Sequence, residues 1–178
     1  EEGLSSFNGD MPNANVTMTG GRAQGTGTVG SFDLQGGTLA PGNSIGTLTV
    51  VGDYVQGSAG TLEIETDAAG NADALDIGGT ASLDGALNVI AETGDYALVT
   101  EYQIISADGG IAGDFDGVTV NLVNLDGAFA ANGTIGTLTL SRNDVTLQSL
   151  AATPNQEAFA AAAAAGGARL LPEATRRA

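Results

Sequence analysis

The chain has 178 residues, of which 42% are hydrophobic, and this is enough for one buried core. It carries 21 acidic against five basic residues, a net charge of −16, so phosphate backbones and anionic membranes repel it and we expect no nucleic-acid partner. The absence of cysteine excludes disulfides and thiolate zinc sites, while 28 glycines and only 4% aromatics favour narrow coils with many turns over an enzyme core built on large aromatics.

Residues 1–97 contain short predicted strands separated by glycine or Asx turns. In residues 61–65 the apolar Leu62 and Ile64 alternate with polar residues, which predicts a strand with one dry and one wet face. Strands that each bury one face, and that turns rather than helices connect, favour a β-solenoid over a βαβ sheet. The predicted strands are 15–19, 28–34, 45–51, 61–66, 74–77 and 86–91.

One short segment occurs twice in the chain. Residues 45–50 read Ile-Gly-Thr-Leu-Thr-Val, and residues 135–140 read Ile-Gly-Thr-Leu-Thr-Leu. A glycine turn that leads into a short strand, used more than once, is typical of stacked coils that bury their apolar sides against their neighbours. The repeat therefore predicts that both copies belong to successive windings.

Residues 98–150 have longer and more apolar predicted strands, at 98–106, 118–125 and 134–150. Turn-forming residues 141–144 (Ser-Arg-Asn-Asp) predict a hairpin between residues 137–140 and 145–147. A solenoid ends in an open coil, whose backbone groups and apolar interior need a cover. We expect this hairpin to be the cap.

Residues 151–178 predict a short helix and a flexible tail. Thr153 at the N-cap, Pro154 at the first helical position and Gln156 three residues after the cap form a strong helix start. Alanines at 160–165 continue the helix, and two glycines at 166–167 end it. The expected fold class is thus all-β, with a hairpin cap and an α-helical tail.

The run from Gly36 to Val50 resembles a segment near the C-terminal end of passenger domains in bacterial autotransporters, the type V secreted proteins of Gram-negative outer membranes. Further pieces occur in the family's order, at 52–54, 60–65, 73–75, 78–83, 102–105 and 153–156, so the resemblance covers about residues 20–156. The motif residues are Gly36, Gly37, Pro41, Gly42, Asn43, Ser44, Ile45 and Gly46.

The resemblance implies a right-handed parallel β-helix over residues 1–97, an autochaperone-like junction over 98–150 that folds first, and a linker helix in 151–178. It also implies location in the outer membrane, at the cell surface or in the medium of a Gram-negative bacterium. The implied partners are the protein's own C-terminal β-barrel, which this chain does not contain, and the periplasmic and outer-membrane assembly machinery. The chain starts without a signal-peptide pattern, so we expect a mature or excised piece.

Residues 42–46 match the G-x-S-x-G pattern of a serine nucleophile. An active serine at position 44 needs a base, and the chain has neither histidine nor lysine. A strand rather than a helix is also predicted after Ser44. We therefore expect a structural turn and no catalytic residue.

Glu63 and Glu65 are predicted to share one face of a strand, about 6–7 Å apart, a separation that overlaps those of glycosidase carboxylates. Any Glu-x-Glu on a strand has this spacing. Some right-handed β-helices are pectate lyases, which makes a polysaccharide-degrading enzyme an alternative by fold analogy alone. Those enzymes need a basic residue at the substrate, and Arg22 is the only one in the coil region.

Four residues form an oxygen-rich stretch that is a weak candidate for calcium, a cation that takes six to eight oxygen ligands. Their spacing follows neither the EF-hand loop nor the nonapeptide repeat of calcium-binding β-rolls, so we favour solvated turn residues and expect no cofactor. The four are Asp67, Asn71, Asp73 and Asp76.

The sequence therefore predicts a structural and secretory segment that is not an enzyme: a β-helical stem with a folding nucleus that drives passenger folding and translocation. An adhesin-type module that binds an unidentified host ligand is the first alternative. A polysaccharide-degrading enzyme is the weaker one.

Overall fold

The computed structural model describes residues 3–143, together with Ala158 and Ala161, both of which are helical. The chain divides into two compact units, Glu1–Arg142 and Asn143–Ala178, and the description below concerns the first. The predicted helix start at Thr153, Pro154 and Gln156 lies outside the described residues. No helix within the described residues is long and apolar enough to cross a membrane.

The first unit is built from strands, which confirms the all-β class. Its thirteen strands join in one mixed sheet, in which most neighbours are parallel. The strands are β1 (Leu4–Ser6), β2 (Asp10–Gly25), β3 (Thr28–Pro41), β4 (Thr47–Val50), β5 (Tyr54–Thr66), β6 (Ala74–Ile77), β7 (Ala81–Leu83), β8 (Ala86–Ala91), β9 (Val99–Ala107), β10 (Ile111–Gly113), β11 (Gly117–Val120), β12 (Leu125–Asn132) and β13 (Ile135–Arg142).

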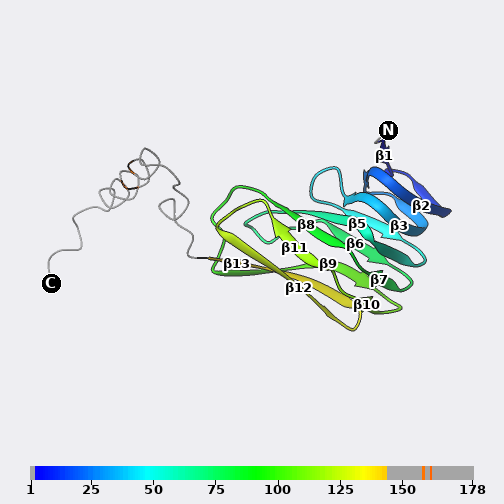
Figure 1. Ribbon diagram of the computed structural model, residues 1–178. Helices are drawn as coiled ribbons and strands as arrows, with labels where there is room; N and C mark the ends of the chain where they lie inside the picture. Colours follow the sequence, from blue (N-terminus) through cyan, green and yellow to red (C-terminus); the bar gives the residue numbers. More distant parts are fainter. Residues whose placement is uncertain (1–2, 144–157, 159–160, 162–178) are drawn as a thin grey trace. The chain divides into compact units, whose positions relative to one another are not determined.

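Parallel strands that follow one another in the chain pair in register, so equivalent residues form columns (Figure 1). One column joins β2, β3, β5, β8 and β11 through Ala23, Leu39, Leu62, Leu87 and Val118. Its first four residues are buried and the fifth is partly buried, because each inward side chain packs on those above and below it.

Two further columns have the same character. One contains Val16, Phe32, Tyr54, Ala81 and Ile111, on β2, β3, β5, β7 and β10. The Phe32 ring lies 6.0 Å from that of Phe7 and 6.3 Å from that of Tyr54, so an aromatic stack runs through this side of the core. The last column joins β3, β4, β6 and β9 through Val29, Val50, Ile77 and Ala107.

The strand direction changes at the end of the series. β13 pairs antiparallel with β9 on one side and with β12 on the other. Phe129 of β12 packs edge-to-face on Phe115, with 4.8 Å between the ring centroids. The buried Leu138 and Leu140 extend the core into this layer, and Figure 1 shows β12 and β13 lying along the preceding strands.

Two details of the sequence prediction are wrong. Ser141 and Arg142 lie in β13, where Ser141 pairs with both Val99 and Asp126, so they form no turn. The hairpin turn instead lies at residues 133–134, where Gly133 has a φ of +66°. A glycine adopts this conformation without steric cost, which explains why the chain reverses there.

The two copies of the Ile-Gly-Thr-Leu-Thr repeat also differ in setting. The first copy enters β4, which pairs parallel with β3 and β6, as expected for a winding. The second enters β13, whose two pairings are antiparallel. The same local strand propensity therefore serves two arrangements, because register and direction are set by neighbouring strands and turns.

Candidate functional site

The motif residues form a corner, residues 36–46, between the end of β3 and the start of β4. Gly37 has a φ of +89°, and a Cβ there would lie 2.5 Å from the carbonyl oxygen of Gly21 in the coil before it. The same crowding recurs at Gly85, where a Cβ would lie 2.5 Å from the Gly60 oxygen. These glycines let backbones stack closely at a turn, where a larger side chain has no room.

The next part of the corner is tied to the preceding coils. Gly42, with a φ of +90°, exchanges two backbone hydrogen bonds with Gly25, each 2.8 Å long. Asn43 donates its amide to Asn8 Oδ1 at 2.8 Å. Pro41 is buried beside these contacts and pairs with Gly25 in the strand register. The corner is thus a joint between windings.

Ser44 is exposed at the tip of the corner and is followed by a strand, as predicted. Its hydroxyl has no hydrogen-bond partner among residues 3–143. Ile45 is partly buried, and the Gly46 N–H donates to Asp73 Oδ1 at 2.8 Å. The geometry supplies no base for Ser44.

Asp73 is the least expected feature of the region, because its side chain is only 1% exposed. Oδ1 accepts the Gly46 N–H and Oδ2 accepts the Glu65 N–H, each at 2.8 Å. Its backbone adds a 2.9 Å bond from the Asp73 N–H to the Glu65 carbonyl. One carboxylate therefore joins the corner to β5 and to the start of β6.

The environment of Asp73 shifts its ionisation. Burial raises the pKa of this carboxyl from 3.8 to about 7, and the negative charges of Glu65 and Glu63 add to the rise. The N–H groups of Glu65 and Gly46 act in the opposite direction, because they stabilise the anion. A carboxyl that titrates near neutrality in this joint makes stability depend on pH.

The other calcium candidates serve separate local contacts. Asp67 accepts the backbone N–H groups of Ala69 and Asn71 at 2.9 and 2.8 Å and the Asn71 side-chain amide at 2.6 Å, which lowers the pKa of Asp67. Asp76 accepts the Ser106 hydroxyl at 2.8 Å. In the part of the chain that the structure describes, no three acidic side chains gather closely enough to hold a metal ion. The structure therefore does not bring the four candidates together.

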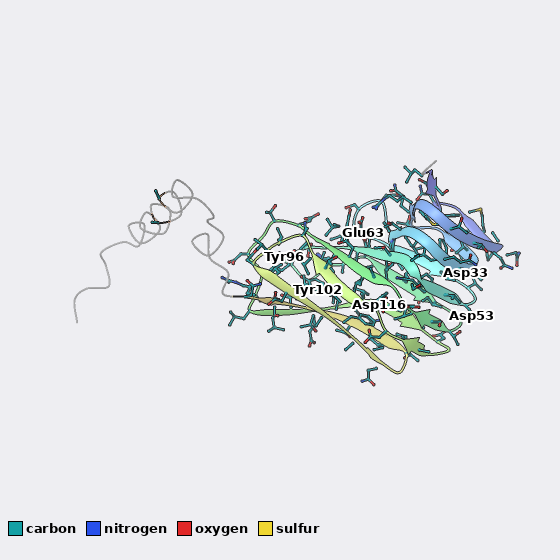
Figure 2. The ribbon with its side chains drawn as sticks, viewed as in Figure 1. Asp33, Asp53, Glu63, Tyr96, Tyr102 and Asp116 are labelled. Carbon is teal, nitrogen blue, oxygen red and sulfur yellow. The ribbon has the colours of Figure 1, made fainter. Side chains whose placement is uncertain are left out.

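Glu63 belongs to a polar ladder across the outer face of β2, β5, β8 and β11. Its Oε1 lies 2.7 Å from Arg22 Nη2, and its Oε2 accepts the Asn88 amide at 2.9 Å. Thr119 donates its hydroxyl to Asn88 Oδ1 at 2.9 Å. Because both oxygens of Glu63 are engaged, it does not form a free carboxylate pair with Glu65. Figure 2 labels Glu63 on β5.

We expect Glu63→Gln to lower the free energy of unfolding by about 0.5–1 kcal/mol, the usual effect of a partly exposed ion pair. The loss shrinks at about 1 M salt, where charges are screened within ~3 Å. Urea unfolding at low and high salt measures both effects. Glu101→Gln, at an exposed position on β9, is the control and leaves stability unchanged; an equal loss in both variants contradicts the ladder's role.

A surface hollow of about 750 Å³ lies beside Arg22, between β1, β2 and β3. Its lining is mostly glycine backbone and threonine, and Arg22, its charged residue, is already paired with Glu63. The hollow has no acid–base pair. It is lined by Gly3, Leu4, Thr19, Gly20, Gly21, Arg22, Gly37 and Thr38.

Sequence reasoning gave no role to two tyrosines near the antiparallel end. Tyr102 donates its hydroxyl to the Asp67 carbonyl at 2.7 Å, and Tyr96 donates to the Glu92 carbonyl at 3.0 Å. Both rings are almost fully buried, and burial raises the pKa of Tyr102 to about 12. Figure 2 shows the two tyrosines close together. They fasten the loop after β5 to the end of the stack.

Comparison with known proteins gives one distant relative to report. No protein-family model matches the chain. The chain is 27% identical over 172 residues to the extracellular serine protease of Serratia marcescens, a match that covers 91% of this chain. The chain spans 16% of that relative's length.

This match corrects one expectation from the sequence. The chain was predicted to be unrelated to enzyme activity, and the relative is a serine protease. The prediction relied on the missing histidine and on the absence of a base near Ser44. Such reasoning examines only the residues of this chain, whereas the relative is several times longer.

Proposed function

We propose that residues 3–143 form the stem of a secreted or surface-exposed bacterial polypeptide of the autotransporter type. In this proposal the stem is a right-handed parallel β-helix, and β9, β12 and β13 are its cap. The extracellular relative and the resemblance of residues 36–50 to autotransporter passengers support the location.

The observation that carries this proposal is the change in pairing along the stack. Parallel strands repeat in register from β2 to β11, and the series ends on an antiparallel layer formed by β13 and β12. An uncovered last coil exposes unpaired backbone groups and an apolar interior. The Phe115–Phe129 contact and the buried Leu138 close that end instead.

Cysteine pairs test the stacked register, because the natural chain has no cysteine to compete. Val55 and Ser82 are exposed partners on β5 and β7, so Val55→Cys with Ser82→Cys is expected to form an intrachain disulfide on mild oxidation. The control joins Val55→Cys to Asp76→Cys on β6, which is not its partner, and stays reduced. Oxidation of the control pair alone contradicts the register.

The cap is also the proposed folding nucleus for the stem. The β12–β13 hairpin joins residues that are close in the chain, so its closure costs less entropy than pairing between distant coils. Adding a coil to an existing layer is easier than starting a stack. Folding from this end then draws the remaining coils into register. The boundaries 1–97, 98–150 and 151–178 belong to this proposal.

The partners in this proposal are the protein's own outer-membrane β-barrel and its assembly machinery. The test uses the full-length protein in its own bacterium, with residues 125–142 deleted and with Glu101→Gln as the control. Antibody labelling of intact cells measures the surface-exposed passenger. The proposal expects labelling to be lost in the deletion and retained in the control. Normal labelling without the hairpin contradicts it.

The Serratia relative favours a second function, proteolysis by the longer polypeptide of which this region would be the stem. A Ser–His–Asp triad needs a histidine, and residues 1–178 contain none, so the reacting serine is proposed to lie elsewhere in that polypeptide. A fluorophosphonate probe on the full-length protein is expected to label such a serine, and Ser44→Ala to leave the labelling intact. No labelled serine and no casein cleavage contradict this function.

A further inference from the structure

We propose that Asn132 is a site of spontaneous deamidation that loosens the cap from the last coil. The chain contains two Asn-Gly pairs, Asn8-Gly9 and Asn132-Gly133. In such a pair the glycine backbone nitrogen attacks the asparagine side-chain carbonyl carbon. The new C–N bond closes a succinimide ring, and the side-chain nitrogen leaves as ammonia. Water then opens the ring to aspartate or isoaspartate.

Asn132 is placed for this attack at the tip of the hairpin. It is exposed, as is Gly133, and Gly133 has a φ of +66° with open space where a Cβ would stand. Within residues 3–143 the Asn132 amide and the Gly133 N–H have no hydrogen-bond partner. Neither the carbonyl carbon nor the attacking nitrogen must therefore break a contact before it reacts.

Asn8 has the same neighbouring glycine but a different setting. Its Oδ1 accepts the Asn43 amide at 2.8 Å and the Thr26 N–H at 3.4 Å. Ring closure at Asn8 has to rotate this amide and break both contacts. The folded protein therefore slows the reaction at Asn8 and leaves Asn132 unrestrained.

The product at Asn132 acts on the attachment of the hairpin tip. The Gly133 carbonyl accepts the Ile111 N–H and the Thr134 carbonyl accepts the Ala107 N–H, each at 2.9 Å. Isoaspartate inserts an extra methylene into the backbone directly before these two carbonyls. Both hydrogen bonds lose their alignment, so the tip detaches from the coil formed by β9 and β10.

The test follows both sites in one sample of the full chain, kept folded in mildly alkaline buffer and mapped by proteolysis and mass spectrometry. In the folded protein, conversion at Asn132 is expected to be about tenfold faster than at Asn8, the effect of roughly one net hydrogen bond. In concentrated urea both sites convert at similar rates, because the restraint on Asn8 is lost. Asn132→Gln removes the product at 132 and leaves the rate at Asn8 unchanged.

Two results would overturn the proposal. Asn8 may not match or exceed Asn132 in the folded protein, and the ratio of the two rates must change in urea; failure of either condition refutes the structural restraint. Hydrogen exchange of the aged protein tests the consequence. The Ile111 and Ala107 amides are expected to exchange faster than in fresh protein and in Asn132→Gln, and unchanged protection contradicts the loosening.

Discussion

Leu138→Ala is expected to lower the free energy of unfolding by about 2–5 kcal/mol and to slow refolding. Leu138 is fully buried on β13, between β9 and β12, so truncation leaves a cavity in the cap. If the cap is the nucleus, most of this loss is already felt in the folding transition state. Urea denaturation measures the equilibrium loss, and stopped-flow refolding measures the rate.

Leu39→Ala is the matched control for this prediction. Leu39 is equally buried, but it lies on β3 near the other end of the stack. We expect a similar equilibrium loss with a nearly unchanged refolding rate and faster unfolding, because this coil is added after the transition state. Slower refolding in Leu39→Ala than in Leu138→Ala would place the nucleus in the first coils.

Asp73→Asn has the second large expected effect, a loss of about 1–3 kcal/mol in the free energy of unfolding. Both carboxylate oxygens accept backbone N–H groups, from Gly46 and Glu65. An asparagine offers one acceptor oxygen and one donor nitrogen, so one buried N–H faces another donor. Asp76→Asn is the control, and its effect stays within about 0.5 kcal/mol because the side chain is exposed.

The same substitution reveals a pH dependence with a defined sign. The pKa of Asp73 is about 7 in the folded protein and 3.8 by default, so the folded state binds more protons between these values. Its contribution to stability is therefore full below about pH 4 and is lost as the pH rises to about 7. The stability of the natural protein relative to Asp73→Asn is expected to fall across this range in urea titrations. A constant difference contradicts the raised pKa.

The coil region was largely predictable from the sequence. β6 and β8 have the predicted bounds, 74–77 and 86–91, because alternating apolar residues between turn residues leave few other options. The predictions missed the short β7 and β10, of three residues each, whose pairing depends on neighbouring coils. Local pattern specifies a strand but gives little information about a three-residue segment that only its neighbours stabilise.

The contacts between coils were not predictable by the same reasoning. Asp73 looks like any turn acid in the sequence, and only the fold buries it against Gly46 and Glu65. Arg22 and Glu63 are far apart in the chain and meet because the coils stack. The hairpin turn was misplaced because Ser-Arg-Asn-Asp and Asn-Gly both contain turn formers, and pairing with β9 and β12 decides between them.

Pulse-labelling hydrogen exchange during refolding tests most directly whether the cap organises the stack. The account predicts that amides of β9, β12 and β13 become protected before those of β3 and β5, and that Leu138→Ala delays protection in both groups. Protection of β3 and β5 first, with the cap strands following, would contradict it.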